Sequence, residues 1–135
     1  MKLVGIDIAK YEHAAFIMEA STGESLCDPF FFKNNKEGFK KLYTELNKYS
    51  KNELLIGMED TGHYNFAIES SLLAEGYKVA LINPITTKSL RKASLKSVKS
   101  DKEDALLITK ALLDKAYYRI ISIQDEKLKE AKELT

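Results

Sequence analysis

The chain has 135 residues, a length that suits one domain. Its 44% hydrophobic and 30% charged residues are typical of a folded globular protein and exclude a disordered one. The 21 basic and 20 acidic residues leave a net charge of +1, so charge alone does not indicate a protein that coats polyanions. The single cysteine, Cys27, excludes an internal disulfide and a zinc site built from several cysteines.

No run of residues approaches the roughly 20 apolar residues of a membrane-spanning helix. Asp7 interrupts the amino-terminal apolar run too early for the apolar region of a signal peptide. We therefore expect a cytoplasmic protein with no membrane partner.

The amino-terminal part predicts three consecutive antiparallel strands. The apolar run Leu3–Ile8 is typical of a buried strand. Two further apolar runs, at residues 16–18 and 30–32, flank a turn that contains Gly23, which is the pattern of a hairpin.

The periodicity then changes, and helices alternate with strands. The predicted segments are a helix that is opened by Asn34–Asn35 and has its apolar positions over 39–46, a strand over 54–58, a helix over 64–72, a strand over 77–82, a helix that begins at Asn83–Pro84 and a long helix over 101–117. Such alternation implies parallel strands joined by right-handed crossovers. We predict an α/β fold, a five-stranded mixed sheet with helices on both faces, in which the first and fourth strands are neighbours.

The pattern weakens after Tyr118. Residues 1–118 are therefore expected to form the folded domain, and residues 119–135 a linker and the beginning of a helix. That last helix, from Asp125 onward, has no stop signal before Thr135, so we expect the chain to continue into something longer, and a frayed terminus is the alternative.

Four acidic residues are placed where they can meet. Asp7 lies near the carboxyl end of the first predicted strand, and Glu59 lies just past the end of the fourth. Neighbouring strands are about 4.8 Å apart, so the two carboxylates would nearly touch at an edge of the sheet where ligands commonly bind. Asp101 and Asp104 are three residues apart and therefore share one face of a helix.

Each acid also has a structural interpretation. Asp7 is unusual inside an apolar buried strand, which favours a function there. Glu59 is explained equally well by the dipole at the start of the next helix. Asp101 and Asp104, considered alone, fit the capping pattern of a helix that begins near Ser100.

A cluster of carboxylates needs a cation, because like charges at close range destabilise one another. Mg²⁺ and Mn²⁺ prefer oxygen ligands and keep positions open for water and phosphate. Two such ions can activate one oxygen and stabilise the leaving oxygen of a phosphodiester. The sequence therefore predicts a Mg²⁺ or Mn²⁺ site that acts on phosphodiesters, if the four acids converge.

A basic stretch precedes the second acidic pair. Between Asn83 and Ser100 there is no acidic residue, and the basic residues are Lys88, Arg91, Lys92, Lys96 and Lys99. Such a stretch can follow a phosphate backbone or form a solvated face, and charge alone leaves both open. Its position beside candidate metal ligands favours nucleic-acid binding.

Read in chain order, four segments resemble the DEDD transposases of the insertion-sequence-110 family and the related Piv-type DNA invertases. The segments are GIDIAK at 5–10, GMEDTGHY at 57–64, GYKV at 76–79 with INP at 82–84, and KSDKEDA at 99–105. Each is weak alone, whereas the ordered set is specific and covers nearly the whole chain.

The resemblance implies a RuvC-like, ribonuclease H-type fold and a Mg²⁺-dependent recombinase that acts on DNA. It assigns the four acids to Asp7, Glu59, Asp101 and Asp104. Family members carry a second, C-terminal domain with a nucleophilic serine, and some are directed by a structured RNA. By this resemblance the chain is an amino-terminal half, incomplete for strand transfer, that would work as a homo-oligomer in the full-length protein.

Other functions remain open at this point. A RuvC-like nuclease or junction resolvase would use the same acids to hydrolyse phosphodiesters, and a non-catalytic nucleic-acid-binding module would need only the basic stretch. A domain of the actin and sugar-kinase type also ends its first strand in an acid, but continues with glycine and threonine rather than Ile8-Ala9-Lys10. Asp60, which replaces a residue that is commonly small or apolar in the family, and His63 have no assigned role.

Overall fold

The computed structural model describes residues 1–93 and 101–123, and the side chains of residues 93 and 101–103 lie outside this description. The helix expected from residue 125 onward falls outside the described residues as well. Within the described residues, no helix has the length and apolar character needed to cross a membrane.

Six strands form one mixed sheet in the order β3-β2-β1-β4-β5-β6. The strands are β1 (Lys2–Asp7), β2 (Glu12–Glu19), β3 (Phe30–Lys33), β4 (Leu54–Glu59), β5 (Lys78–Ile82) and β6 (Tyr118–Ile121). The first three strands are antiparallel neighbours, and β1, β4 and β5 run parallel. Thus the predicted mixed sheet is confirmed, including the pairing of the first and fourth strands.

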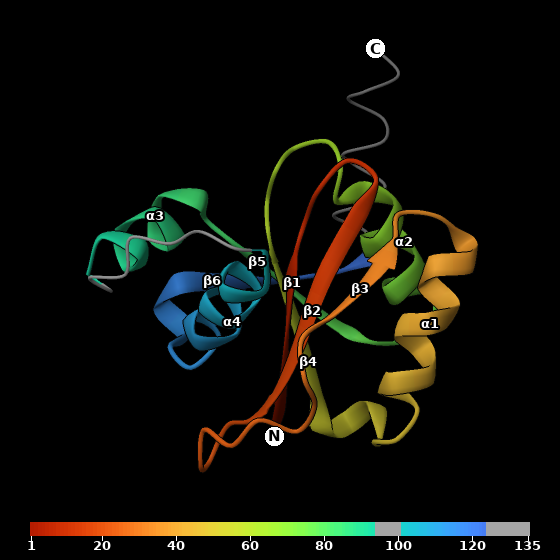
Figure 1. Cartoon of the computed structure of the whole chain (residues 1–135), viewed down its shortest axis with the longest axis horizontal. Coiled ribbons are helices and arrows are strands. Elements are labelled where there is room, and N and C mark those ends of the chain that lie inside the picture. The colour runs from red at the N-terminus through yellow and green to blue at the C-terminus, as the bar shows by residue number, and fades with distance from the viewer. Residues whose placement is uncertain (94–100, 124–135) are drawn as a thin grey trace.

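Helices cover both faces of this sheet, as predicted (Figure 1). They are α1 (Lys36–Leu46), α2 (Phe66–Ala74), α3 (Pro84–Ala93) and α4 (Asp101–Ala111), with short 3-10 turns at Lys51–Glu53 and Lys115–Tyr117. The helices α1 and α2 lie on one side of the strands, and α3 and α4 lie on the other.

Two apolar cores follow from the alternation of side chains along the strands. On one side, Val4 and Ile56 pack with Leu42 of α1 and Leu72 of α2. On the other side, the odd-numbered residues of β1 and β4 face α4, as Leu3 does. The face that a strand residue occupies therefore decides which pair of helices it meets.

The start of α1 shows how local sequence positions a helix. Asn35 has an extended backbone, and its side chain accepts a hydrogen bond of 2.8 Å from the backbone N–H of Gly38. This bond satisfies one of the N–H groups that a helix leaves unpaired in its first turn. The predicted helix opening at Asn34–Asn35 is thereby confirmed.

The carboxyl-terminal part corrects two predictions. The sheet has six strands rather than five, and the long helix expected over 101–117 ends at Ala111. The residues that follow turn back, and Tyr118–Ile121 pairs antiparallel with β5. This pairing satisfies the backbone groups along the open edge of β5 and buries Ile121, a gain that outweighs a longer helix. Part of the segment expected as a linker therefore belongs to the sheet.

Candidate active site

The ends of two neighbouring parallel strands place two of the predicted acids. Gly5 is opposite Gly57 and Ile6 is opposite Met58, so Asp7 and Glu59 end β1 and β4 at the next step of the same register. Both residues are partly buried. Because side chains alternate along a strand, Asp7 and Glu59 share the face of the two glycines, which is the face that α4 covers.

The two glycines let α4 lie directly on the strands. A Cβ atom at Gly5 would stand 2.1 Å from the hydroxyl oxygen of Thr109 and 2.6 Å from the carbonyl oxygen of Ala105. A Cβ atom at Gly57 would meet the side chain of Leu112 at 2.4 Å. Side chains here would hold the helix away from the sheet, so the glycines bring the amino-terminal turns of α4 to the edge where β1 and β4 end.

Arg91 of α3 joins the two acids that come from different elements. Its Nε atom lies 3.0 Å from Oδ1 of Asp104 on α4, and its Nη2 atom lies 3.7 Å from Oε1 of Glu59. The three side chains are 30%, 20% and 17% exposed, in the order Arg91, Asp104, Glu59. A pair shielded from solvent to this degree is screened less than a surface ion pair.

Thr87 provides a second polar contact to Glu59. Its side chain is fully buried, and its hydroxyl donates a hydrogen bond to Oε1 of Glu59 while also lying 3.0 Å from the carbonyl oxygen of Pro84. Thr87 and Arg91 are four residues apart and so lie on the same face of α3. The sequence signal for the role of Thr87 is its spacing of four residues before Arg91, after the helix start at Asn83–Pro84.

The predicted residues are brought together only in part. Glu59 and Asp104 share one cation, and Asp7 ends the strand beside Glu59. Asp101 begins α4 one turn before Asp104, but its side chain lies outside the described part. Within the part of the chain that is described, no group of three or more metal-ligating side chains stands close enough to hold a metal ion.

The predicted basic stretch divides in the structure. Lys88 and Lys92 are exposed on α3, whereas Arg91 turns toward the acids. Lys96 and Lys99 lie outside the described residues. The sequence favoured phosphate binding for the stretch, whereas Arg91 pairs with two carboxylates, for which an arginine has the reach and the forked donor geometry.

The loop after β4 accounts for Asp60 without a metal. Its Oδ1 atom accepts a hydrogen bond of 3.0 Å from the backbone N–H of Gly62, which has a positive φ of 77°. This is an Asx-type turn, which gives Asp60 a structural role. His63 is exposed in the same loop, and its ring packs edge-on against that of Tyr64.

His13 belongs to the core of the sheet. It is fully buried on β2, and its Nδ1 atom accepts a hydrogen bond of 3.1 Å from the backbone N–H of Ala9. Burial lowers the pKa of His13 below its usual value, because desolvation disfavours the charged ring. His13 is therefore a neutral structural histidine.

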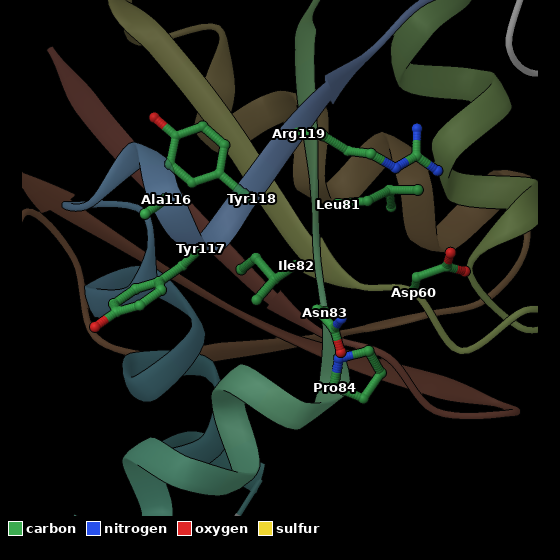
Figure 2. Close-up of a pocket in the computed structure, with 9 residues that line it drawn as sticks. All are labelled: Asp60, Leu81, Ile82, Asn83, Pro84, Ala116, Tyr117, Tyr118 and Arg119. Atoms are coloured by element: carbon green, nitrogen blue, oxygen red, sulfur yellow. The ribbon is translucent and has the colours of Figure 1, made fainter.

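A pocket of about 340 Å³ opens where β5 meets β6 (Figure 2). Figure 2 shows the two tyrosine rings on one side of the pocket and Asp60 and Arg119 on the other. Asn83 and Pro84, at the start of α3, form part of its wall. Among the described residues that line it, Asp60 alone is acidic, which is too few carboxylates for a divalent-cation site built from those residues.

Known proteins resemble this chain in sequence. A family model described as a transposase, the DEDD type of insertion sequence 110, matches residues 4–135. The pilin gene-inverting proteins of Moraxella bovis and Moraxella lacunata are each 28% identical over 109 residues, which is 79% of this chain. The chain spans 33% of the length of each of these relatives.

Solved structures resemble it in fold. The Thermus thermophilus RuvC structure gives a TM-score of 0.61 at 12% identity and covers 90% of this chain and 100% of that one. The structure of T. thermophilus RuvC in complex with a Holliday junction substrate gives a TM-score of 0.56 at 14% identity, over 81% and 90% of the two chains. The RuvC-like, ribonuclease H-type fold is confirmed.

Proposed function

Since the chain belongs to the DEDD transposases of the insertion-sequence-110 family, we propose that it is the metal-dependent catalytic domain of a DNA transposase or site-specific recombinase. The observation that carries this proposal is the meeting of Glu59 and Asp104 on one positive charge at the carboxyl edge of a RuvC-like sheet. Two carboxylates on separate elements repel each other at close range, so their meeting around one positive charge is the arrangement that a cation site requires.

The proposed metal ligands are the carboxylates of Asp7, Glu59, Asp101 and Asp104. DEDD and RuvC-like nuclease families generally use divalent metal ions, and we propose Mg²⁺ or Mn²⁺ here. The donors fit, because they are all oxygens and because the guanidinium of Arg91 already stands between two of them as a cation. When bound, the metal would activate an oxygen nucleophile and stabilise the leaving oxygen of a phosphodiester.

The chain's own residues orient these ligands. The Thr87 hydroxyl holds one oxygen of Glu59 and so fixes its rotamer. Gly5 lets α4 carry Asp104 to the ends of β1 and β4. Together these contacts hold Glu59 and Asp104 near each other before any metal arrives, which reduces the reorganisation that binding requires of these two acids.

DNA is the proposed substrate. Lys88 and Lys92 are exposed on the helix that also reaches into the acids. We propose that they contact the phosphate backbone together with Lys96 and Lys99. The T. thermophilus RuvC complex contains a Holliday junction, which supports a DNA substrate for this fold.

The rest of the full-length protein is also part of the proposal. The chain covers a third of its curated relatives, so we propose that a C-terminal domain follows the catalytic domain, beyond β6, and supplies the nucleophilic serine of the family. Assembly as a homo-oligomer and direction by a structured RNA would belong to that longer protein.

A second function is hydrolysis by the same acids. The likeness to RuvC supports a junction-resolving nuclease as the alternative. Incubation of the full-length protein with branched DNA separates the two: a transposase or recombinase joins strands into new products, whereas a resolvase leaves only cleaved ones.

Metal-dependent stability tests the proposed site. Thermal unfolding is recorded with increasing Mn²⁺ or Mg²⁺ for the wild type, for Asp7→Asn, and for Asp28→Asn, a control at an exposed acid on the loop before β3. A ligand that binds only the folded state stabilises it by about 2.7 kcal/mol at 100 times its Kd. We expect the wild type and the control to respond, and Asp7→Asn to lose the response.

Two results would contradict the proposal. A metal response that survives in Asp7→Asn would remove Asp7 from the site. DNA affinity without any metal response, unchanged in Asp7→Asn, would indicate a non-catalytic nucleic-acid-binding module instead.

A further inference from the structure

Arg91 occupies the oxygen atoms that the proposed metal needs. Its guanidinium contacts Oδ1 of Asp104 at 3.0 Å and Oε1 of Glu59 at 3.7 Å. The guanidinium of an arginine is a cation with five N–H donors. The site therefore contains its own cation before any metal binds.

The contact is built rather than incidental. Arg91 reaches two elements other than its own, β4 and α4, and its Nε–H makes a well-formed hydrogen bond to Asp104. Thr87, one turn earlier on α3, holds the same oxygen of Glu59 that faces Arg91. Two residues of α3 thus keep Glu59 in place from one side.

A divalent cation and this guanidinium compete for the same space. Mg²⁺ binds its oxygen ligands at about 2.0–2.1 Å, so it would have to lie among the oxygens that Arg91 now contacts. A guanidinium left in contact with these ligands would also repel the metal, because both are cations. Metal binding and the Arg91 contacts are therefore mutually opposed.

We propose that Arg91 is the counter-ion of the metal-free site and that a divalent cation displaces it. The proposal rests on the proposed function, since it assumes that Glu59 and Asp104 bind the metal. In the metal-free protein Arg91 neutralises the acids and weakens metal binding. Once displaced, Arg91 joins Lys88 and Lys92 as a cation available to DNA phosphates, so metal loading and DNA binding favour each other.

The test measures Mn²⁺ affinity by calorimetry in the wild type, in Arg91→Gln, and in Lys92→Gln, a matched loss of charge at the exposed neighbouring residue. We expect Arg91→Gln to bind Mn²⁺ roughly tenfold more tightly, in the range of couplings between sites, and Lys92→Gln to bind like the wild type. Without metal, Arg91→Gln should unfold at a lower temperature than the wild type, and saturating Mn²⁺ should close that gap.

A measurement on the wild type keeps the proposal testable if Arg91→Gln fails to fold. Titration with diamagnetic Mg²⁺ should move the Nε–H resonance of Arg91 in an ¹⁵N spectrum from its hydrogen-bonded position toward that of a solvated arginine. A resonance that stays in place while Mg²⁺ saturates the protein would overturn displacement.

The outcomes separate the two proposals. Equal or weaker Mn²⁺ binding by Arg91→Gln, with the response still abolished in Asp7→Asn, would overturn the role of Arg91 and leave the metal site standing. No Mn²⁺ binding in either the wild type or Arg91→Gln would overturn the metal site, and the role of Arg91 with it.

Discussion

Gly5→Ala is the substitution that most directly tests how the fold builds the site. Gly5 sits on β1 directly beneath α4, and the added methyl group would meet three atoms of that helix. The distances are 2.1 Å to the Thr109 hydroxyl oxygen and 2.6 Å both to the Ala105 carbonyl oxygen and to the Thr109 backbone nitrogen. Two of the three atoms belong to the backbone, so no change of side-chain rotamer relieves the clash.

The distances set the size of the effect. The shortest ordinary contact of a Cβ atom is 3.4 Å, whereas the backbone atoms of Ala105 and Thr109 would lie 2.6 Å from the new methyl group. The helix backbone must therefore move away by about 0.8 Å. Overpacking of this kind costs about 1–3 kcal/mol, and we expect the upper half of that range because a whole helix has to move. The same movement draws Asp104 away from the ends of β1 and β4, so the stabilisation by Mn²⁺ should fall along with the free energy of unfolding.

Urea unfolding with and without Mn²⁺ measures both effects. Gly57→Ala is the matched control, because the three nearest atoms that its methyl group would meet all belong to the side chain of Leu112, which can rotate. We expect Gly57→Ala to lose about 1 kcal/mol and to keep its metal response. The reasoning is refuted if Gly5→Ala and Gly57→Ala are equally stable and respond equally to Mn²⁺, since α4 would then not depend on its close approach at Gly5.

Two further substitutions address single contacts. Thr87→Val removes the buried hydroxyl that donates to Glu59, and we expect the free energy of unfolding to fall by about 1.5 kcal/mol, the low end for a hydrogen bond to a charged group, because Glu59 is 17% exposed. The control is Thr87→Ser, which keeps the hydroxyl and should match the wild type in urea unfolding. Equal losses of stability in both variants would argue against this hydrogen bond. Burial lowers the pKa of His13 in the folded protein from its usual value of 6.5. Below pH 6.5 the unfolded chain therefore binds a proton at His13 that the folded protein does not bind. The free energy of unfolding should fall as the pH drops from 6.5 toward the pKa of the folded state. His13→Asn should flatten this slope, which is at most about 1.4 kcal/mol per pH unit, and an unchanged slope would mean that another group causes it.

The sequence was informative about the acids because their positions follow from local rules. Asp7 and Glu59 each end an apolar run, and parallel strands align their carboxyl ends, so the alternation of helices and strands was enough to place both at one edge. Asp101 and Asp104 followed from helical spacing in the same way. The family resemblance supplied the chemistry that these positions by themselves left open.

The sequence was less informative about Arg91, since a basic residue looks the same whether it faces solvent or an acid. Lys88, Arg91 and Lys92 belong to one charged stretch, and only the packing of α3 against α4 directs Arg91 inward while its neighbours remain exposed. The direction of a long side chain depends on residues distant in the chain, here Glu59 and Asp104, and so it has no local signature.

Up to Ala111, the types of the helices and strands, their order and the pairing of β1 with β4 could be predicted from the sequence alone, because hydrophobic periodicity records which face of each segment is buried and alternating strands and helices imply parallel pairing. Only the tertiary structure decided that α4 rests on Gly5, that Arg91 lies between the acids, and that Tyr118–Ile121 completes the sheet instead of leaving it. The physical reason is that these three features depend on close packing and on unpaired backbone groups between segments far apart in the chain, which no local pattern encodes.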